Sequence, residues 1–348
     1  MVSVGAVFVI AEAGVNHNGD ISMALQLCDA AEKAGADAIK FQTFRAEDLV
    51  VRGTPTADYQ ARQTGEQDQF LMLERLELSV AQHQKIRTHC DMIGIEFFST
   101  PFSVIAVDML VKLGVKRLKL SSGELTHRAL VEHTAATQLP LLMSTGMGTM
   151  DEINEALSWV KEARGHLRDV VVLHCTSAYP APDETLNLNA MQSMAHDLHV
   201  SIGYSDHSLG IEAALAAVAL GASVIEKHLT LDRMLPGPDH SASLEPQEFA
   251  RMVHAIRRVS VMLGDGVKAP LPEEIETARV ARRSVVAAAD IAAGVAITAD
   301  KLMCRRPATG IAPRDLPRVI GQFSRTAITA GSVLQWDQLT DRMFQPLP

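Results

Sequence analysis

Eight short apolar runs, each ending in polar residues, recur between residues 7 and 230 and limit the possible folds most strongly. The runs cover residues 7–14, 36–44, 95–102, 116–124, 140–147, 170–180, 200–208 and 222–230. Between them lie Ala- and Leu-rich amphipathic segments, such as residues 20–34 and 150–163, each followed by a glycine. Eight strands with helical crossovers predict an α/β fold of the (β/α)8 TIM-barrel type.

Two segments depart from this regular spacing. Residues 45–80 form a polar stretch after the second run and predict a loop that covers the mouth of the barrel. A change in composition after residue 264, with Gly266, Pro270 and Pro272, indicates a linker over residues 265–281. We therefore expect a catalytic barrel over residues 1–264 and a small domain over residues 282–348 that is built from short strands and turns.

Charge and cysteine content exclude several classes of protein. The formal net charge is -9 and no Lys/Arg-rich block occurs, so we expect no nucleic-acid partner. No apolar stretch reaches about 18 residues, so we expect no membrane span. The four cysteines are scattered without CxxC spacing, which predicts free thiols in a reducing cytoplasm rather than disulfides or a zinc site.

Polar side chains at the ends of all eight runs should converge, because the carboxyl ends of parallel barrel strands meet at one face. They are Glu12, Asn16, His17, Lys40, Gln42, Ser99, Thr100, Lys119, Ser122, Glu124, Ser144, Thr145, Ser177, Tyr179, Ser205, His207, His228 and Asp239. One such residue is usually a strand cap, but eight sets in register predict a functional site.

The composition of this ring indicates an anionic substrate. Lys40 and Lys119 supply positive charge, and several hydroxyl groups supply hydrogen-bond donors, as a phosphate requires. An alternative is that one of the two lysines forms a Schiff base, as in class I aldolases.

Two histidines at neighbouring strand ends, His207 and His228, predict a divalent metal such as manganese or zinc. Glu12 belongs to the strand that closes the barrel beside them. Cys175 follows His174 on one strand, so the two side chains point to opposite faces, and we expect Cys175 in the core rather than as a nucleophile.

These motifs closely resemble those of the sialic acid synthase family, which includes the N-acetylneuraminate, legionaminate and pseudaminate synthases. The resemblance covers nearly the whole chain and lies in the segments IAEAGVNHNGD, ADAIKFQTF, FFSTPF, LKLSSGEL, LMSTGM, LHCTSAYPAP, IGYSDHS and IEKHLTLDRMLPGPDHSAS. From about residue 284 the chain resembles the antifreeze-like (SAF) domain of that family.

The resemblance implies roles for the ring residues. Phosphoenolpyruvate would be held by Lys40, Thr100, Lys119, Ser122, Ser144 and Ser205, joined by Ser177, where some family members carry an asparagine. A divalent metal, Mn²⁺ with Mg²⁺ or Co²⁺ as alternatives, would be bound by His207 and His228.

The resemblance also implies how the second substrate is held. Glu12, Gln42, Glu124, Tyr179 and Asp239 would face the metal-bound water or the amino sugar. Arg306 would reach the N-acetyl group in a partner subunit, which requires a domain-swapped homodimer. We expect Glu124 to manage protons at the reacting centre and Glu12 to hold the metal-bound water.

The implied reaction joins phosphoenolpyruvate to the open-chain aldehyde of N-acetylmannosamine and releases N-acetylneuraminate and phosphate. An alternative within the family is an N,N'-diacetyllegionaminate synthase that uses 2,4-diacetamido-2,4,6-trideoxymannose. An alternative outside catalysis is an inactive sugar-binding scaffold, although retention of the lysines, histidines and glutamates argues against it.

Overall fold

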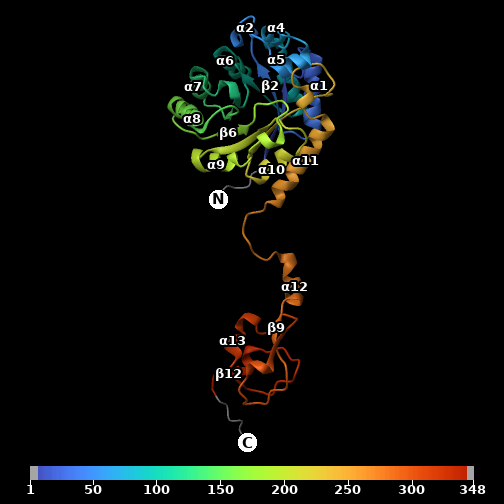
Figure 1. Cartoon of the computed structure of the whole chain (residues 1–348), viewed down its shortest axis with the longest axis vertical. Helices are drawn as coiled ribbons and strands as arrows, with labels where there is room; N and C mark the ends of the chain where they lie inside the picture. The colour runs from blue at the N-terminus through green and yellow to red at the C-terminus, as the bar shows by residue number, and fades with distance from the viewer. Residues whose placement is uncertain (1–6, 343–348) are drawn as a thin grey trace. The chain divides into compact units, whose positions relative to one another are not determined.

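The computed structural model describes residues 7–342, apart from the side chains of Asp58, Tyr59 and Arg62. The chain divides into two compact units between Asp265 and Gly266. Figure 1 labels their elements, which are described here one unit at a time. No helix among the described residues is long and apolar enough to cross a membrane.

The first unit is built around one eight-stranded parallel sheet. Its strands are β1 (Phe8–Gly14), β2 (Ala38–Thr43), β3 (Glu96–Pro101), β4 (Leu118–Leu120), β5 (Leu141–Ser144), β6 (Val170–Cys175), β7 (Ser201–Asp206) and β8 (Val224–His228). The hydrogen-bonded order is β3-β2-β1-β8-β7-β6-β5-β4, and the two end strands β3 and β4 also contact each other. The sheet therefore curls into a nearly closed barrel, and the predicted fold class is confirmed.

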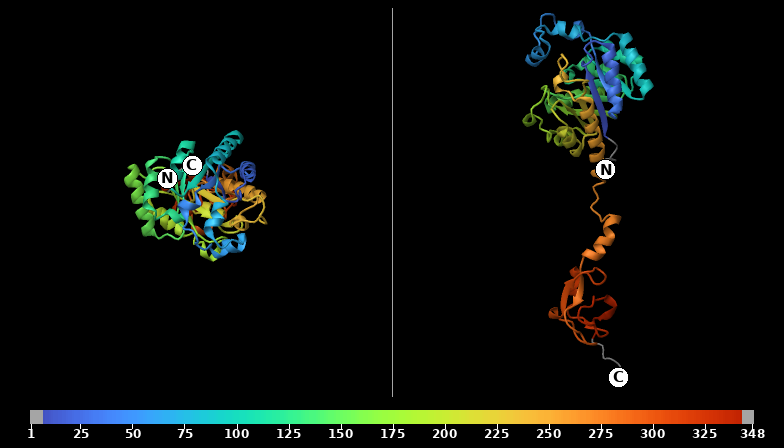
Figure 2. Two further views of the ribbon diagram at one scale, coloured as in Figure 1. Left: turned by 90° about the horizontal axis from the view of Figure 1, so that it is seen from above. Right: turned by 90° about the vertical axis from the view of Figure 1, so that its right-hand side faces the viewer.

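Helices surround this barrel on the outside, as Figure 2 shows from a second direction. The main ones are α1 (Ile21–Lys33), α5 (Val80–Ile93), α6 (Val104–Leu113), α7 (Arg128–Ala136), α8 (Met150–Arg164), α9 (Ala190–Leu198), α10 (Glu212–Ala219) and α11 (Pro246–Met262). Their ends follow the sequence signals: the Asp20 side chain caps α1, and Thr149 with Glu152 forms a capping box on α8.

The strands are buried on both faces, inside the barrel and against the helices. Val9, Ile10, Ile39 and Leu118 are inaccessible to solvent, which explains why the runs are continuously apolar. At Gly203 of β7, a Cβ atom would stand 2.7 Å from the carbonyl oxygen of Val224 on β8. Only glycine allows these two strands to approach so closely at this point.

The predicted loop over residues 45–80 folds into short helices rather than an irregular stretch. They are α2 (Ala46–Leu49), α3 (Asp58–Thr64) and α4 (Gln69–Glu74). Met72 and Leu76 of this segment pack with Val15 and Phe44 in a small apolar cluster of their own. The cluster attaches the segment to the loops that follow β1 and β2.

The second unit is small and has a separate core. It contains α12 (Pro272–Ala281), β9 (Ser284–Ala287), β10 (Leu302–Arg305), α13 (Leu316–Val319), β11 (Phe323–Ser324) and β12 (Leu339–Thr340). Apolar residues such as Val285, Ile297 and Leu334 form its core. Helix α12 lies within the predicted linker over residues 265–281, so that segment is partly helical rather than irregular throughout.

Candidate active site

The carboxyl ends of the barrel strands surround a cavity of about 480 Å³. Its lining contains twelve of the predicted ring residues, namely Glu12, Lys40, Gln42, Thr100, Lys119, Ser122, Ser144, Ser177, Tyr179, Ser205, His207 and His228. Strand alternation explains this convergence, because residues two apart on one strand point to the same face. The structure thus brings most of the predicted site residues together.

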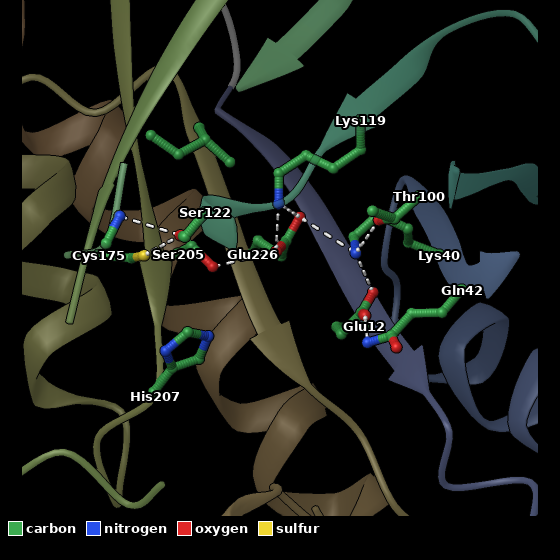
Figure 3. A network of polar contacts seen from close by, with 12 residues as sticks. Glu12, Lys40, Gln42, Thr100, Lys119, Ser122, Cys175, Ser205, His207 and Glu226 are labelled. Carbon is green, nitrogen blue, oxygen red and sulfur yellow. Dashed lines mark hydrogen bonds and ion pairs between the residues drawn. The ribbon is translucent and has the colours of Figure 1, made fainter. Parts of the chain in front are cut away.

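Glu226 of β8 lies at the centre of the cavity and was not predicted. Its two carboxylate oxygens lie 2.9 and 3.2 Å from Lys119 Nζ. Ser205 Oγ donates a hydrogen bond of 3.0 Å to the same carboxylate, and Lys40 Nζ lies 3.8 Å away. Figure 3 shows Glu226 between the two lysines and Ser205. One carboxylate therefore fixes three of the groups that were predicted to hold phosphoenolpyruvate.

Lys40 of β2 is held by a second set of partners. Its Nζ contacts Glu12 Oε2 at 2.7 Å and donates to Thr100 Oγ1 at 2.8 Å. Gln42 reaches the other oxygen of Glu12 at 3.5 Å. Because Glu12, Lys40 and Thr100 are all buried, this network keeps the ammonium group in one position at the base of the cavity.

The two buried carboxylates differ in their ionisation. Burial disfavours the charged form of Glu226, but Lys119 and Lys40 outweigh it and lower the pKa of this carboxyl to about 2. Burial raises the pKa of Glu12 to about 7, with Lys40 offsetting part of that effect and Glu226 adding to it. Glu226 is thus a fixed anion near neutral pH, whereas Glu12 can gain or lose a proton.

Hydroxyl groups line the side of the cavity beyond the lysines. Ser122 Oγ accepts a hydrogen bond of 2.9 Å from the backbone N–H of Gly146. Ser144 is buried, and its hydroxyl has no hydrogen-bond partner among the described residues. A buried hydroxyl left unpaired inside a cavity is a donor available to a bound anion.

Gly146 and Cys175 lie next to these hydroxyls. A Cβ atom at position 146 would collide with the side chains of Ser177 and Cys175, so the loop after β5 needs glycine there. Cys175 is buried, as predicted, but its sulfur lies 3.2 Å from Ser122 Oγ. The prediction that Cys175 is a core residue is thereby confirmed, and Figure 3 shows its thiol beside Ser122, a residue of the cavity lining.

The two predicted metal ligands face each other at the other side of the cavity. The ring centroids of His207 and His228 are 5.6 Å apart, and the Tyr179 ring stacks on His207 at 4.2 Å. His207 Nδ1 lies 2.7 Å from the carbonyl oxygen of Thr176. This hydrogen bond assigns the proton to Nδ1 and leaves the Nε2 lone pair directed elsewhere.

Both imidazoles are in the neutral state that metal binding requires. Burial lowers the pKa of His207 to about 4 and that of His228 well below its usual value, so both are neutral near pH 7. His228 Nδ1 is buried without a hydrogen-bond partner among the described residues, and Asp239 Oδ2 lies 3.9 Å from it. Within the described residues no group of three His, Cys, Asp or Glu side chains is arranged as a complete metal site. The two neutral imidazoles therefore fit a divalent metal whose remaining ligands come from water or substrate.

Asp239 lies beside His228 rather than in the lining of the cavity. A Cβ at Gly14 would stand 3.4 Å from Glu12 Oε1 and 3.5 Å from Asp239 Oδ2, so both carboxylates lie close to this glycine. Burial raises the pKa of Asp239 to about 6. The segment that contains Asp239 is attached through Asn16, whose Nδ2 donates to Leu229 O and to Ser243 Oγ.

Glu124 is the predicted site residue whose placement in the barrel differs most from expectation. It ends a short 3-10 helix (Ser122–Glu124), and its carboxylate contacts His127 Nδ1 at 2.6 Å. Ser122 and Gly123 line the cavity, but Glu124 is not among its lining residues. Its proton-transfer role stays a prediction. Arg306 follows β10 of the second unit and is exposed.

The segment over residues 45–80 contributes the part of the lining that the sequence could not specify. Ala57, Gln60 and Gln69 line the cavity together with Phe102 from the loop after β3. Among the described lining residues, Lys40 and Lys119 are the only lysines or arginines. The base of the cavity is therefore ionic, whereas the side formed by this segment is uncharged.

Glu226 could have been found from the sequence by strand periodicity. It lies two residues before His228 in the run 222–230, so the two side chains share the inner face of the barrel. The polar residue that ends this run, His228, does not by itself indicate Glu226. Applying the period of two to the whole strand would have added this glutamate to the candidate site.

This geometry defines a class of protein, a barrel whose mouth combines two buried lysines and several hydroxyl groups with two neutral imidazoles. The pattern of the NeuB family matches residues 27–268, and that of the SAF domain matches residues 282–340. The chain belongs to the NeuB family. The predicted relationship to sialic acid synthases and the predicted C-terminal SAF domain are thereby confirmed.

Individual relatives cover nearly the whole chain. N,N'-diacetyllegionaminic acid synthase of Legionella pneumophila is 44% identical, over 95% of this chain and 94% of its own length. N-acetylneuraminate-9-phosphate synthase of Mus musculus is 36% identical, over 90% of this chain and 88% of its own length. The crystal structure of N-acetylneuraminic acid synthetase from Leptospira borgpetersenii, in complex with citrate, superimposes with a TM-score of 0.71. It is 36% identical and covers 79% of this chain and 91% of its own.

Proposed function

We propose that the protein condenses phosphoenolpyruvate with the open-chain aldehyde of a 2-acetamido sugar to give a nine-carbon 2-keto acid and phosphate. The observation that carries this proposal is the pair of buried lysines, Lys40 and Lys119, held by Glu12 and Glu226 beside a row of hydroxyls. Fixed ammonium groups and unpaired hydroxyls suit a compact substrate with phosphate and carboxylate groups. The relatedness to sugar-acid synthases supports the same reaction class.

The proposed reaction forms one carbon–carbon bond and breaks one carbon–oxygen bond. C3 of phosphoenolpyruvate attacks the aldehyde carbon of the sugar, whose oxygen gains a proton and becomes a hydroxyl group. Water adds at C2, and phosphate leaves with the C2–O bond electrons, so that C2 becomes the keto carbon. The reactants phosphoenolpyruvate, sugar and water are thus fully accounted for in the keto acid and phosphate.

The residues of the cavity would have distinct roles in this reaction. Lys40, Lys119, Thr100, Ser122, Ser144, Ser177 and Ser205 would bind and orient phosphoenolpyruvate. Glu12, whose carboxyl has a pKa raised to about 7, would exchange a proton on the metal side of the cavity. His207 and His228 would hold a divalent metal, Mn²⁺ in first place with Mg²⁺ or Co²⁺ as alternatives. A metal bound there supplies Lewis-acid polarisation of the aldehyde oxygen.

For the sugar, we propose 2,4-diacetamido-2,4,6-trideoxymannose, with N-acetylmannosamine as the second candidate. The higher identity to the legionaminic acid synthase supports this order, which reverses the preference from motifs alone. The uncharged side of the cavity, with Gln42, Gln60, Gln69 and Phe102, offers amide and aromatic contacts that suit acetamido and methyl groups. Tyr179 and Asp239 would contact the same substrate.

The proposal extends to assembly and location. Arg306 would complete the sugar site of a partner subunit in a domain-swapped homodimer, because it belongs to a unit with its own core beyond the barrel. We place the protein in the cytoplasm, because the four cysteines are free thiols.

A phosphate-release assay with phosphoenolpyruvate and a panel of free sugars tests the proposal. We expect turnover with the diacetamido sugar to exceed that with N-acetylmannosamine, and we expect a chelator to abolish both. If no sugar of the panel led to phosphate release, the proposed reaction would be contradicted. The alternative of an inactive sugar-binding scaffold would then be favoured. Borohydride trapping of substrate on Lys40 or Lys119 would instead indicate the Schiff-base mechanism.

A further inference from the structure

A second buried ion pair lies behind the two candidate metal ligands, on the outer side of the barrel wall. Asp206 ends β7, Lys227 lies in β8, and the two residues are direct partners in the strand register. Lys227 Nζ and Asp206 Oδ2 are 2.7 Å apart, and both side chains are 0% exposed. Because Ser205 and Glu226 line the cavity, strand alternation turns Asp206 and Lys227 toward the helices.

The pair also holds the backbone on the far side of His207. Lys227 Nζ donates to the carbonyl oxygen of Ser208. Asp206 Oδ1 accepts hydrogen bonds from the Ser208 backbone N–H at 2.9 Å and from the Ser208 hydroxyl at 2.7 Å. The residues immediately before and after His207 are thus bound to one another and to Lys227. The segment 206–208 has little freedom to rotate the imidazole between them.

Each candidate ligand directly follows one member of the pair, since His207 follows Asp206 and His228 follows Lys227. Fixing the pair therefore fixes the backbone of one imidazole relative to the other. The ring of His207 is held independently by Thr176 O at 2.7 Å. With the ring of His207 and the backbone at both histidines constrained, the direction of the His207 imidazole and its separation from the backbone of His228 are set before any ligand binds.

Stability alone is a weak reason for such a pair. Replacing a buried ion pair by well-packed apolar residues is often neutral or stabilising, whereas a pair that sets a register has a specific role. We infer that Lys227 and Asp206 are positioning residues that pre-organise His207 and His228 for a divalent metal. This inference rests on the proposed metal role of the two histidines. Neither residue of the pair lines the cavity.

Direct metal binding separates this role from a purely structural one. Isothermal titration of the full-length protein with Mn²⁺ would compare the wild type with Asp206→Asn, Lys227→Met and His207→Ala. We expect His207→Ala to abolish binding and each pair variant to weaken it by tenfold to hundredfold, as loss of groups that orient metal ligands usually does. Ser208→Ala keeps the ion pair and loses one hydrogen bond, so it should fold normally and weaken binding by a few-fold.

Glu96→Gln is the matched control. It breaks the partly buried Glu96–Arg117 pair, in which Arg117 Nε lies 2.6 Å from Glu96 Oε1. Glu96 begins β3 and Arg117 directly precedes β4, so this pair lies at the end of the barrel opposite the mouth. It should lower the thermal midpoint and leave the Mn²⁺ affinity within twofold of the wild type.

The outcomes separate the metal role of the two histidines from the positioning role of Asp206 and Lys227. If the wild type binds no Mn²⁺, the proposed metal role is wrong and the positioning role is overturned with it. If the wild type binds and His207→Ala does not, the metal role stands. In that case Mn²⁺ affinities of Asp206→Asn, Lys227→Met and Ser208→Ala within twofold of the wild type would overturn the positioning role alone.

Discussion

Glu226 and Lys119 form a bidentate ion pair inside the barrel, with the Lys119 ammonium 2.9 and 3.2 Å from the two carboxylate oxygens. Both side chains are almost fully buried, at 5% and 3% exposure. The pair comes from strands β4 and β8, which are not neighbours in the sheet, and so it spans the barrel interior. The proposed anion-binding site is therefore built around an internal carboxylate that keeps its lysines in place.

Replacing Glu226 by Gln removes the negative charge and leaves two buried ammonium groups without their shared partner. Removing one partner of a buried ion pair typically costs about 3–5 kcal/mol. We expect a clear drop in the thermal midpoint and a loss of turnover, because Lys119 is no longer held in its ionised form. Ser205→Ala, which removes one hydrogen bond to the same charged carboxylate, should cost less, about 1.5–3 kcal/mol. Equal midpoints for the two variants would contradict this central role.

Lys119→Ala tests the anion-binding half of the cavity. Truncating a buried charged group that contacts a ligand typically costs about 2–5 kcal/mol, so kcat/KM for phosphoenolpyruvate should fall roughly 30-fold or more. Lys116→Ala is the matched control, because Lys116 lies three residues earlier and is exposed. Steady-state kinetics at saturating sugar would measure both. Equal effects of the two substitutions would show that general charge, rather than the site, attracts the substrate.

The strand pattern made most of the barrel predictable, because β/α repeats follow from periodicity and chain order. Contacts across the barrel were harder to foresee. Glu226 meets Lys119 over 107 positions of sequence, and Cys175 meets Ser122 over 53. His17 illustrates the opposite error, because it is fully buried beside Phe41 and outside the lining of the cavity. A sequence shows which residues end a strand, but the packing of the following turn decides where they point.

The pKa values of the two histidines predict how metal affinity depends on pH. Burial lowers the pKa of His207 to about 4 and that of His228 well below its usual value, so protons compete for the imidazoles only at pH values well below 6.5. We expect nearly constant Mn²⁺ affinity between pH 8 and pH 5.5 in a Glu12→Gln, Asp239→Asn variant, in which the two nearby carboxyls with raised pKa values no longer titrate. If each imidazole had the ordinary pKa of about 6.5, protonation of each would lower the Mn²⁺ affinity roughly tenfold by pH 5.5. A steep loss of Mn²⁺ binding between pH 7 and pH 6 would refute the assignment.

Arg306→Ala tests the contribution of the second unit. If this guanidinium binds the sugar's acetamido group in a partner subunit, the substitution should raise the KM for the sugar about tenfold and leave the KM for phosphoenolpyruvate unchanged. Arg305→Ala is the control, because Arg305 is the preceding residue and is also exposed. If the protein were monomeric by light scattering and still fully active, the partner-subunit arrangement would be wrong.

Glu12→Gln should change the way stability depends on pH. Burial raises the pKa of Glu12 from 4.5 to about 7, so the folded state holds a proton that the unfolded state has released in that interval. Its contribution to stability is therefore fully present below pH 4.5 and is lost as the pH rises through about 7, at about 1.4 kcal/mol for each unit between the two pKa values. The Gln side chain does not titrate, so the variant does not lose this contribution. Its stability relative to the wild type should therefore increase as the pH rises from 5 to 8. Thermal midpoints of both proteins across that range would measure the gain, and a constant difference would mean that Lys40 keeps Glu12 ionised throughout.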